Sequence, residues 1–158
     1  MPSRIGVKGR ARRAARPAPR ADPPCSCFRL RRAARRLTQA YDQALRPAGL
    51  RGTQFSLLSH VLREDGLSVT DLAERMAMER TTLTRNLRPL QKAGLLRVEP
   101  GADRRSRAVR ITAQGRQAFE AALPLWRAAE RDFRRQMGKE QVAALHRLLD
   151  QAAASLVE

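Results

Sequence analysis

The sequence predicts a mainly α-helical fold with one small β-hairpin, and two observations lead to this fold class. Apolar residues recur at three- and four-residue spacing over most of the chain from Phe28 onward, which is the pattern of amphipathic helices that pack on a core. Only one stretch, 95–112, contains two short strand-like runs separated by turn-forming residues. At 158 residues the chain has the usual length of one domain.

The segment 1–24 differs from the rest of the chain in composition. It contains seven basic residues and one acid, and it has no aromatic residue. Such a segment cannot bury enough apolar surface to offset the entropy that ordering removes. We therefore expect a disordered basic tail over 1–24 and a single folded domain over 25–158.

The first predicted helix, at 28–46, has an apolar stripe on one face and a basic face opposite. The basic face consists of Arg29, Arg31, Arg32, Arg35 and Arg36. Pro47 and Gly49 act as stop signals for this helix. A second helix fits 53–64, where apolar residues again recur at helical spacing, and Asp65-Gly66 then turns the chain.

Two further helices follow in close succession. Ser68 and Asp71 resemble a capping box at the start of a short helix. The next helix is predicted from Arg80 to Ala93, and Gly94 closes it because a glycine just past a helix tolerates left-handed geometry.

The rest of the chain is predicted to form the hairpin and two more helices. The strands are expected at 95–98 and 108–112, with an arginine-rich tip between them. Thr112 fits the N-cap of a long helix, which Pro124 is expected to bend. A final helix is predicted over 139–156.

This order of short helix, turn, helix and hairpin is the winged helix-turn-helix arrangement, and it occupies 53–112. The flanking helices at 28–46 and 113–156 are too apolar along their stripes to serve a small winged domain alone. We therefore predict that they are dimerisation helices of a homodimer.

The charge of the chain narrows the class of partner. The net charge is +17 and the isoelectric point is about 11.7, which favours nucleic acid or an acidic membrane surface. Aromatic residues make up only 4%, which argues against stacking on single-stranded nucleic acid. The basic faces are spread over several elements instead of one amphipathic stripe, so no membrane partner is expected. Double-stranded DNA is the predicted partner.

The helix at 80–93 carries the candidate base-reading residues. Leu83, Leu87 and Leu90 must face the core, and at about 100° per residue the opposite face is polar and then cationic. The first residues of a recognition helix meet base edges in the major groove, where Thr can contact a base and Arg can bind guanine. The predicted major-groove residues are Arg80, Thr81, Thr82, Thr84, Arg85 and Arg88. Lys92, and Arg88 beside it, fit phosphate contacts. The alternative is an ordinary amphipathic helix with a solvated charged face.

The hairpin tip strengthens the DNA-binding interpretation. Only Glu99 and Asp103 are near enough to offset its arginines, which are Arg104, Arg105, Arg107 and Arg110. Such a tip repels itself unless it meets an anionic partner, and a narrow minor groove with its negative potential is such a partner. The predicted DNA-binding residues of the wing are Asp103, Arg104, Arg105 and Arg107.

From about Cys25 to its end, the chain resembles the MarR family of bacterial transcriptional regulators. The resemblance is carried by Pro47-Ala48-Gly49-Leu50 with Gln54-Phe55, Asp71-Leu72-Ala73-Glu74, Arg80-Thr81-Thr82-Leu83-Thr84-Arg85, Gly94-Leu95-Leu96, and Asp103, Arg105 and Thr112. It implies a dimeric repressor on a pseudo-palindromic operator, with Arg105 in the minor groove and Asp103 bracing it. It also implies release by a small phenolic or anionic effector. Glu79 at the N-cap position and Pro89 inside the recognition helix depart from the expected pattern.

Two cysteines suggest a second means of release. Cys25 and Cys27 lie where a helix start and neighbouring arginines favour a reactive thiolate. Within the resemblance, Cys27 aligns with the peroxide-sensing cysteine of the organic-hydroperoxide-responsive branch, and Tyr41 aligns with one of its thiol-supporting tyrosines. Gly52 and Arg31 stand where that branch has aromatic residues. The alternative is a pair of incidental thiols.

Other classes of function find little support in the sequence. It shows no glycine-rich phosphate loop, no metal-ligand spacing and no nucleophile–base pairing, so we expect neither an enzyme nor a cofactor. The main alternative is a nucleoid- or ribosome-associated protein that binds nucleic acid without sequence preference. Cysteine usage and the lack of a secretory signal predict a cytoplasmic, nucleoid-associated protein.

Overall fold

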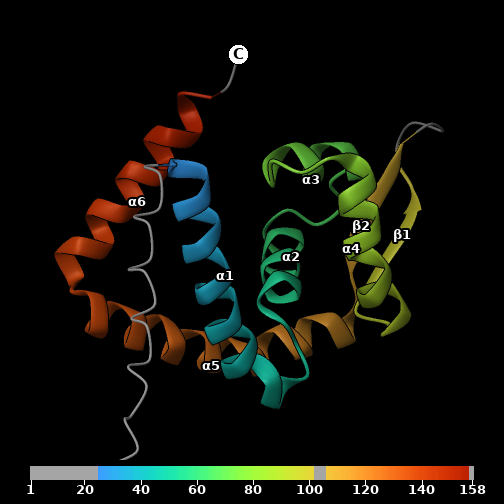
Figure 1. Ribbon diagram of the computed structural model, residues 1–158. Coiled ribbons are helices and arrows are strands. Elements are labelled where there is room, and N and C mark those ends of the chain that lie inside the picture. Colours follow the sequence, from blue (N-terminus) through green and yellow to red (C-terminus); the bar gives the residue numbers. More distant parts are fainter. Residues whose placement is uncertain (1–24, 102–105, 157–158) are drawn as a thin grey trace, which may run out of the picture.

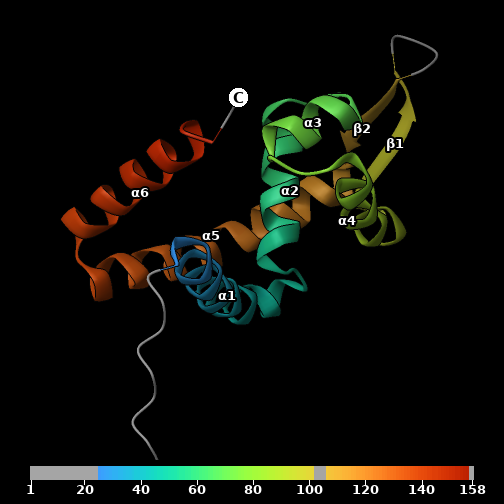
Figure 2. The ribbon, with the colours of Figure 1, turned by 45° about the horizontal axis from the view of Figure 1, so that its top comes forward.

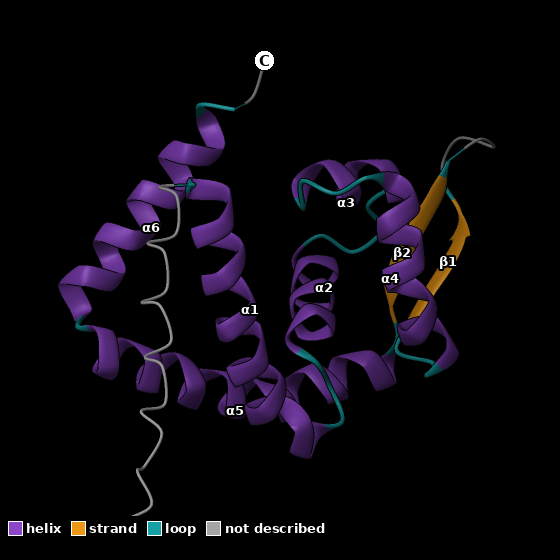
Figure 3. Cartoon of the chain, in the orientation of Figure 1, coloured by secondary structure: helices purple, strands orange, loops and turns teal. Residues whose placement is uncertain are grey.

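In the computed structural model, which describes residues 25–101 and 106–156, the chain consists of helices and one two-stranded hairpin (Figure 1). The elements in order are α1 (Ser26–Leu45), a short 3-10 helix (Arg46–Ala48), α2 (Gly52–Arg63), α3 (Val69–Arg75), α4 (Arg80–Lys92), β1 (Leu96–Pro100), β2 (Arg107–Ile111), α5 (Ala113–Met137) and α6 (Lys139–Ala154). Within the described residues, strands occur only in the hairpin, where β1 and β2 pair antiparallel (Figure 3). The predicted fold class is confirmed.

The elements form two parts that α5 connects. The helices α2, α3 and α4 and the hairpin lie together, and we call this part the hairpin lobe (52–111). α5 starts at the hairpin and passes α2 on its way to the other part (Figures 1 and 2). There α1 packs against α5, and α6 turns away from the end of α5.

Leucine side chains of the helices form the centre of the hairpin lobe. Leu83, Leu87 and Leu90 of α4 are buried, as their spacing predicted. Phe55 of α2 stacks on Phe119 and Trp126 of α5, with ring centroids 4.9 and 5.6 Å apart. These aromatic contacts extend the core along α5, because stacked rings bury large apolar areas.

Two predicted N-caps are confirmed by hydrogen bonds. The Ser68 hydroxyl accepts from the main-chain N–H of Asp71 at 3.0 Å and starts α3. The Thr112 hydroxyl accepts from the N–H of Gly115 at 2.9 Å and starts α5. The same hydroxyl donates to the main-chain oxygen of Gly94 at 2.7 Å, so Thr112 also joins the start of α5 to the end of α4.

The turn between α3 and α4 is made without a glycine. Ala77 has a φ of 47°, in the left-handed region that a side chain disfavours. The N–H of Ala77 donates to Glu74 and the N–H of Met78 donates to Ala73, so two carbonyls at the end of α3 are satisfied. This tight turn sets the angle at which α4 leaves α3.

The strands are displaced from their predicted bounds for a local reason. The N–H of Leu95 donates to Leu90 and completes the end of α4, so β1 begins one residue later, at Leu96. Thr112 leaves β2 because its side chain caps α5. At the other end, Pro100 pairs with Arg107 and lengthens both strands toward the tip.

The helix ends also differ from prediction by one or two residues. α1 begins at Ser26 and α2 at Gly52, and α6 ends at Ala154. Pro89 and Pro124 lie inside the uninterrupted helices α4 and α5. Among the described helices, none is both long enough and apolar enough to cross a membrane.

Candidate nucleic-acid interface

The exposed face of α4 gathers most of the residues predicted to meet the major groove. Burial of its three leucines turns the opposite face of the helix outward. The side chains on that face line one shallow hollow, and they are Arg80, Thr81, Thr84, Arg85 and Arg88. Thr82 is exposed but lies outside this hollow. Lys92 is exposed in the last turn of α4.

The cations of this face have no counter-ion within the described part of the chain. No carboxylate there lies within ion-pair distance of Arg80, Arg85 or Arg88. Glu79 precedes them at the N-cap, but its side chain makes no capping hydrogen bond. The face therefore presents several guanidinium groups, whose planar donors fit phosphate oxygens and guanine edges.

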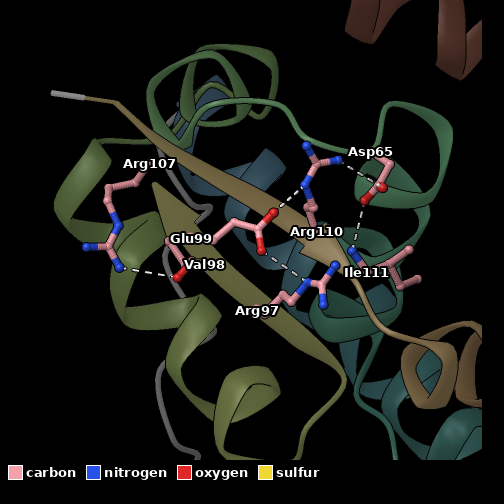
Figure 4. Close-up of polar contacts among 7 residues, drawn as sticks. All are labelled: Asp65, Arg97, Val98, Glu99, Arg107, Arg110 and Ile111. Carbon is pink, nitrogen blue, oxygen red and sulfur yellow. Dashed lines mark hydrogen bonds and ion pairs between the residues drawn. The ribbon is translucent and has the colours of Figure 1, made fainter. Parts of the chain in front are cut away.

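At the base of the hairpin, by contrast, an arginine is held by the chain itself (Figure 4). Arg110 of β2 donates through Nε to Glu99 at 2.5 Å, and its Nη1 lies 3.4 Å from Asp65. The other oxygen of Asp65 accepts from the N–H of Ile111 at 3.0 Å. The hydrogen bond and charge of Glu99, together with Asp65, raise the pKa of Arg110. Counting Arg110 among the self-repelling arginines of the tip was wrong, because two acids of its own lobe neutralise it.

This cluster joins the hairpin to the turn between α2 and α3. The N–H of Gly66 donates to Val109 at 3.0 Å, and the N–H of Val109 donates to Leu67 at 2.8 Å. Gly66 has a φ of 91°, a conformation that a side chain disfavours, and a Cβ there would also lie 2.9 Å from a guanidinium nitrogen of Arg110, which would have to shift. Asp65 is thus a brace of the hairpin. The sequence marked it only as a turn residue, and it lies 45 positions from Arg110.

Arg107 is the one predicted wing residue that the structure describes. It is exposed, and its guanidinium donates to the main-chain oxygen of Val98 at 3.2 Å. Side chains alternate between the two faces of a strand, so Arg107 and Arg110 lie on opposite faces of β2 (Figure 4). Arg107 shares a hollow between α4 and the hairpin with Arg80 and Thr84. The other predicted wing residues, Asp103, Arg104 and Arg105, and the tail 1–24 lie outside the described residues.

A further concave site lies between the two parts of the molecule. It has a volume of about 410 Å³ and is lined by side chains of α1, α2 and α5. Its lining includes the aromatic side chains of Tyr41, Phe55 and Trp126, and His60 and Arg63 contribute nitrogen atoms. Of the predicted site residues only Tyr41 lines this cavity, because the cavity forms only when α1 and α5 meet α2.

Tyr41 makes a polar contact between α1 and α5. Its hydroxyl donates a hydrogen bond to the carboxylate of Glu130, which also accepts from Arg134 at 2.7 Å. Burial, and then the hydrogen bond and charge of Glu130, raise the pKa of Tyr41 above its ordinary value of 10.0. Burial raises the pKa of Glu130, but the bonds from Tyr41 and Arg134 and the nearby charges outweigh it and leave that pKa lowered.

The two cysteines are exposed at the start of α1. Cys25 is the N-cap residue and Cys27 lies in the first turn. Tyr41 is fourteen residues further along the same helix, which corresponds to roughly 21 Å at the rise of an α-helix. The structure therefore does not bring Tyr41 to a thiol of its own chain. No group of His, Cys, Asp and Glu in the described part could hold a metal ion.

Comparisons with known proteins agree with this arrangement. The model of the MarR family matches residues 48–106. The transcriptional regulator MosR of M. tuberculosis, solved in complex with DNA, is 42% identical, with 84% of this chain and 99% of MosR covered and a TM-score of 0.73. The transcriptional repressor CouR, bound to a 23-mer DNA duplex, is 25% identical over 82% of this chain and 92% of CouR, with a TM-score of 0.74.

A curated relative adds a third comparison. The transcriptional activatory protein BadR of Rhodopseudomonas palustris is 35% identical over 106 residues. The match covers 64% of this chain and 61% of BadR, so the chain spans about three-fifths of the length of that relative.

Proposed function

This chain belongs to the MarR family of transcriptional regulators, and we propose that it binds double-stranded DNA as a homodimer and represses transcription from a pseudo-palindromic operator. The observation that carries the proposal is the face of α4, where three arginines without an ion-pair partner among the described residues adjoin two threonines beside the hairpin. The DNA complex of the 42% identical MosR supports it. Members of the family are transcription regulators and not enzymes.

In this proposal the helix and the hairpin have separate contacts. The first turns of α4 enter the major groove, where Arg80, Thr81, Thr82, Thr84 and Arg85 read base edges. Arg88 and Lys92 bind phosphates. The wing residues Arg104, Arg105 and Arg107 reach the minor groove, and Asp103 braces Arg105. The site of action would be the nucleoid, in the cytoplasm.

The exposed apolar side chains of α1 and α6 support a dimer. Phe28 and Leu30 of α1 are 42% and 45% exposed, and Leu148 and Leu149 of α6 are 63% and 39% exposed. Apolar surface of this extent on two helices favours burial against a second copy. Leu148→Asp should produce monomers in size-exclusion chromatography with light scattering. A variant that remains a dimer with full DNA affinity would contradict this assignment of α6.

Selection of bound fragments from the host genome tests the central claim. A sequence-specific dimer should enrich one pseudo-palindromic site with half-sites about one helical turn apart. Arg85→Ala should reduce the preference for this site over random duplex, whereas Arg105→Ala should weaken binding and leave the major-groove preference. The alternative, a basic protein without sequence preference, predicts no enriched site and only a salt-dependent affinity.

The direction of regulation needs a separate measurement. CouR is named a repressor and BadR an activatory protein, so the relatives differ. Repression predicts that transcripts next to the selected site rise when the gene is deleted. A fall in those transcripts would instead indicate activation.

We propose that the cavity lined by Tyr41, Phe55 and Trp126 holds a small phenolic or anionic effector. Its volume of about 410 Å³ lies in the range of small-molecule sites, and such sites are mostly apolar with a few placed polar groups. Arg63 supplies a cation for an anionic group. Calorimetric titration with a panel of phenols and aromatic carboxylates should find a ligand. The affinity for this ligand should be lower when the protein is bound to its operator. Arg63→Gln should weaken the binding of carboxylates more than the binding of phenols if the arginine contacts the anionic group.

We also propose thiol oxidation at Cys27 as an independent route to release. Both thiols are exposed, and attack of the Cys27 thiolate on an organic hydroperoxide would transfer one oxygen to sulfur and yield a sulfenic acid and an alcohol. A contribution of Tyr41 would require the thiol of a second copy, given its distance along α1. Cys27→Ser should abolish peroxide-induced release from DNA, with Cys25→Ser as the comparison. Persistent release, or none in the wild type, would contradict the redox hypothesis.

A further inference from the structure

One threonine on the exposed face of α4 already uses its hydroxyl hydrogen within the chain. The Oγ1 of Thr84 donates to the main-chain oxygen of Arg80 at 2.8 Å. Helical threonines make this bond when the hydroxyl turns toward the preceding turn. A hydroxyl has a single hydrogen, so Thr84 cannot also donate to DNA while this bond is intact. It can offer a base only an accepting oxygen and a methyl group.

The position of Thr84 places this methyl group among the residues that the proposed function assigns to the major groove. Thr84 is the fifth residue of α4 and is exposed. It lies one turn after Arg80 and one turn before Arg88, and it lines the hollow that also contains Thr81 and Arg85. The early residues of a recognition helix are those that reach base edges.

Thymine is the base whose major-groove edge carries a methyl group. Contact between that group and the methyl of Thr84 removes apolar surface from water and needs no hydrogen-bond donor. We propose that Thr84 selects a thymine in each half-site by methyl–methyl contact. This inference rests on the proposed function, because it requires α4 to lie in the major groove.

A different contact is also chemically available to Thr84, and it can be separated by experiment. The amino group of adenine or cytosine could donate to Oγ1. Valine keeps the methyl group and lacks the oxygen, whereas serine keeps the oxygen and lacks the methyl group. The variants Thr84→Val and Thr84→Ser therefore distinguish the two contacts.

The experiment uses the site selected from the genome. Each thymine of one half-site, with its symmetry mate, is replaced in turn by deoxyuridine, which lacks only the methyl group. Binding of the full chain is measured by fluorescence anisotropy. At one position the wild type should bind uracil about fourfold more weakly per half-site, the value of one buried methyl group. Thr84→Val should retain this preference, and Thr84→Ser should bind both duplexes equally.

Thr70 of α3 provides the control, because it is an exposed helical threonine to which the proposed function assigns no DNA contact. Thr70→Ser should keep the preference at the same thymine, and circular dichroism should show equal helix content in all variants. The proposal is overturned if no thymine shows a preference in the wild type, if Thr84→Ser retains it, or if Thr84→Val loses it. A selection that enriches no site would instead contradict the proposed function itself.

Discussion

The arginines of α4 and those at the base of the hairpin differ in whether the chain supplies an acidic partner. Within the described residues, Arg80, Arg85 and Arg88 have no acidic partner, whereas Arg110 is held between Glu99 and Asp65 (Figure 4). A guanidinium held between two acids of its own chain is neutralised and positioned, so its removal should lower stability. A guanidinium without a partner is available to an external anion, so its removal changes binding.

The largest expected effect is on binding and follows from Arg85. Arg85→Ala should weaken operator affinity by about ten- to a hundredfold, because one bidentate contact to a base accounts for about 1–3 kcal/mol of discrimination. Its thermal unfolding midpoint should stay close to that of the wild type. Anisotropy titrations and differential scanning calorimetry measure the two quantities.

Arg97 is the matched control for this prediction. It is exposed on β1 and lies 3.3 Å from Glu99, an ion pair of the kind that contributes little to stability. Arg97→Ala should change operator affinity by about twofold or less. If Arg97→Ala and Arg85→Ala weaken binding equally, positive charge as such is the determinant and the comparison fails.

The contact between Tyr41 and Glu130 is a paired polar site in the other part of the molecule, and it predicts a dependence of stability on pH. The folded state holds the pKa of Tyr41 above its ordinary value of 10.0. Above about pH 10 the unfolded chain loses this proton and the folded chain keeps it, so stability should fall as pH rises further. Below pH 10 the contribution is fully present. Tyr41→Phe should flatten this alkaline fall in urea unfolding curves.

The same pair offers a direct spectroscopic check. Tyr41 is the only tyrosine in the chain, so ultraviolet absorbance follows its ionisation alone. The midpoint should lie above 10.0 in the folded protein and return to about 10 in denaturant. Equal midpoints in the folded and denatured states would contradict a hydrogen bond from Tyr41 to Glu130. At the acidic end, the lowered pKa of Glu130 predicts that its contribution is lost as pH falls below about 4.5.

A substitution at the base of the hairpin should mainly change the stability of the fold. Asp65→Ala removes the acceptor for the N–H of Ile111 and one partner of Arg110, and it should lower the free energy of unfolding by about 1 kcal/mol. Glu64→Ala, which removes an exposed ion pair with Arg75, is the control and should change it less. Unfolding in urea measures both. Equal losses would mean that Asp65 is an ordinary surface acid.

The sequence was sufficient to predict those features of the structure that depend on local spacing. The leucines of α4 repeat at helical spacing, so they predicted both the buried face and the position of Arg85 opposite it. Ser68 and Thr112 predicted helix starts because a capping residue acts within three positions of itself. These inferences need no knowledge of tertiary structure.

Features that depend on distant segments were not predictable in this way. Asp65 and Arg110 are 45 positions apart, and nothing in either local sequence pairs them. The cavity beside Tyr41 arises where α1, α2 and α5 meet. Ala77 takes a left-handed conformation that would ordinarily signal glycine, so the tight turn before α4 had no sequence marker at its centre.

The smallest expected effect concerns the start of α4, where a charged residue occupies the N-cap without capping. The side chain of Glu79 makes no hydrogen bond to the first turn. Serine accepts such a bond readily, so Glu79→Ser should raise the free energy of unfolding by about 0.5–1 kcal/mol in thermal unfolding. It also removes a negative charge next to Arg80, which should strengthen DNA binding most at low salt. Glu74→Ser, inside α3, is the control and should not stabilise the chain. A gain in stability with no gain in affinity would place Glu79 away from the DNA, and the face of α4 would then begin at Thr81.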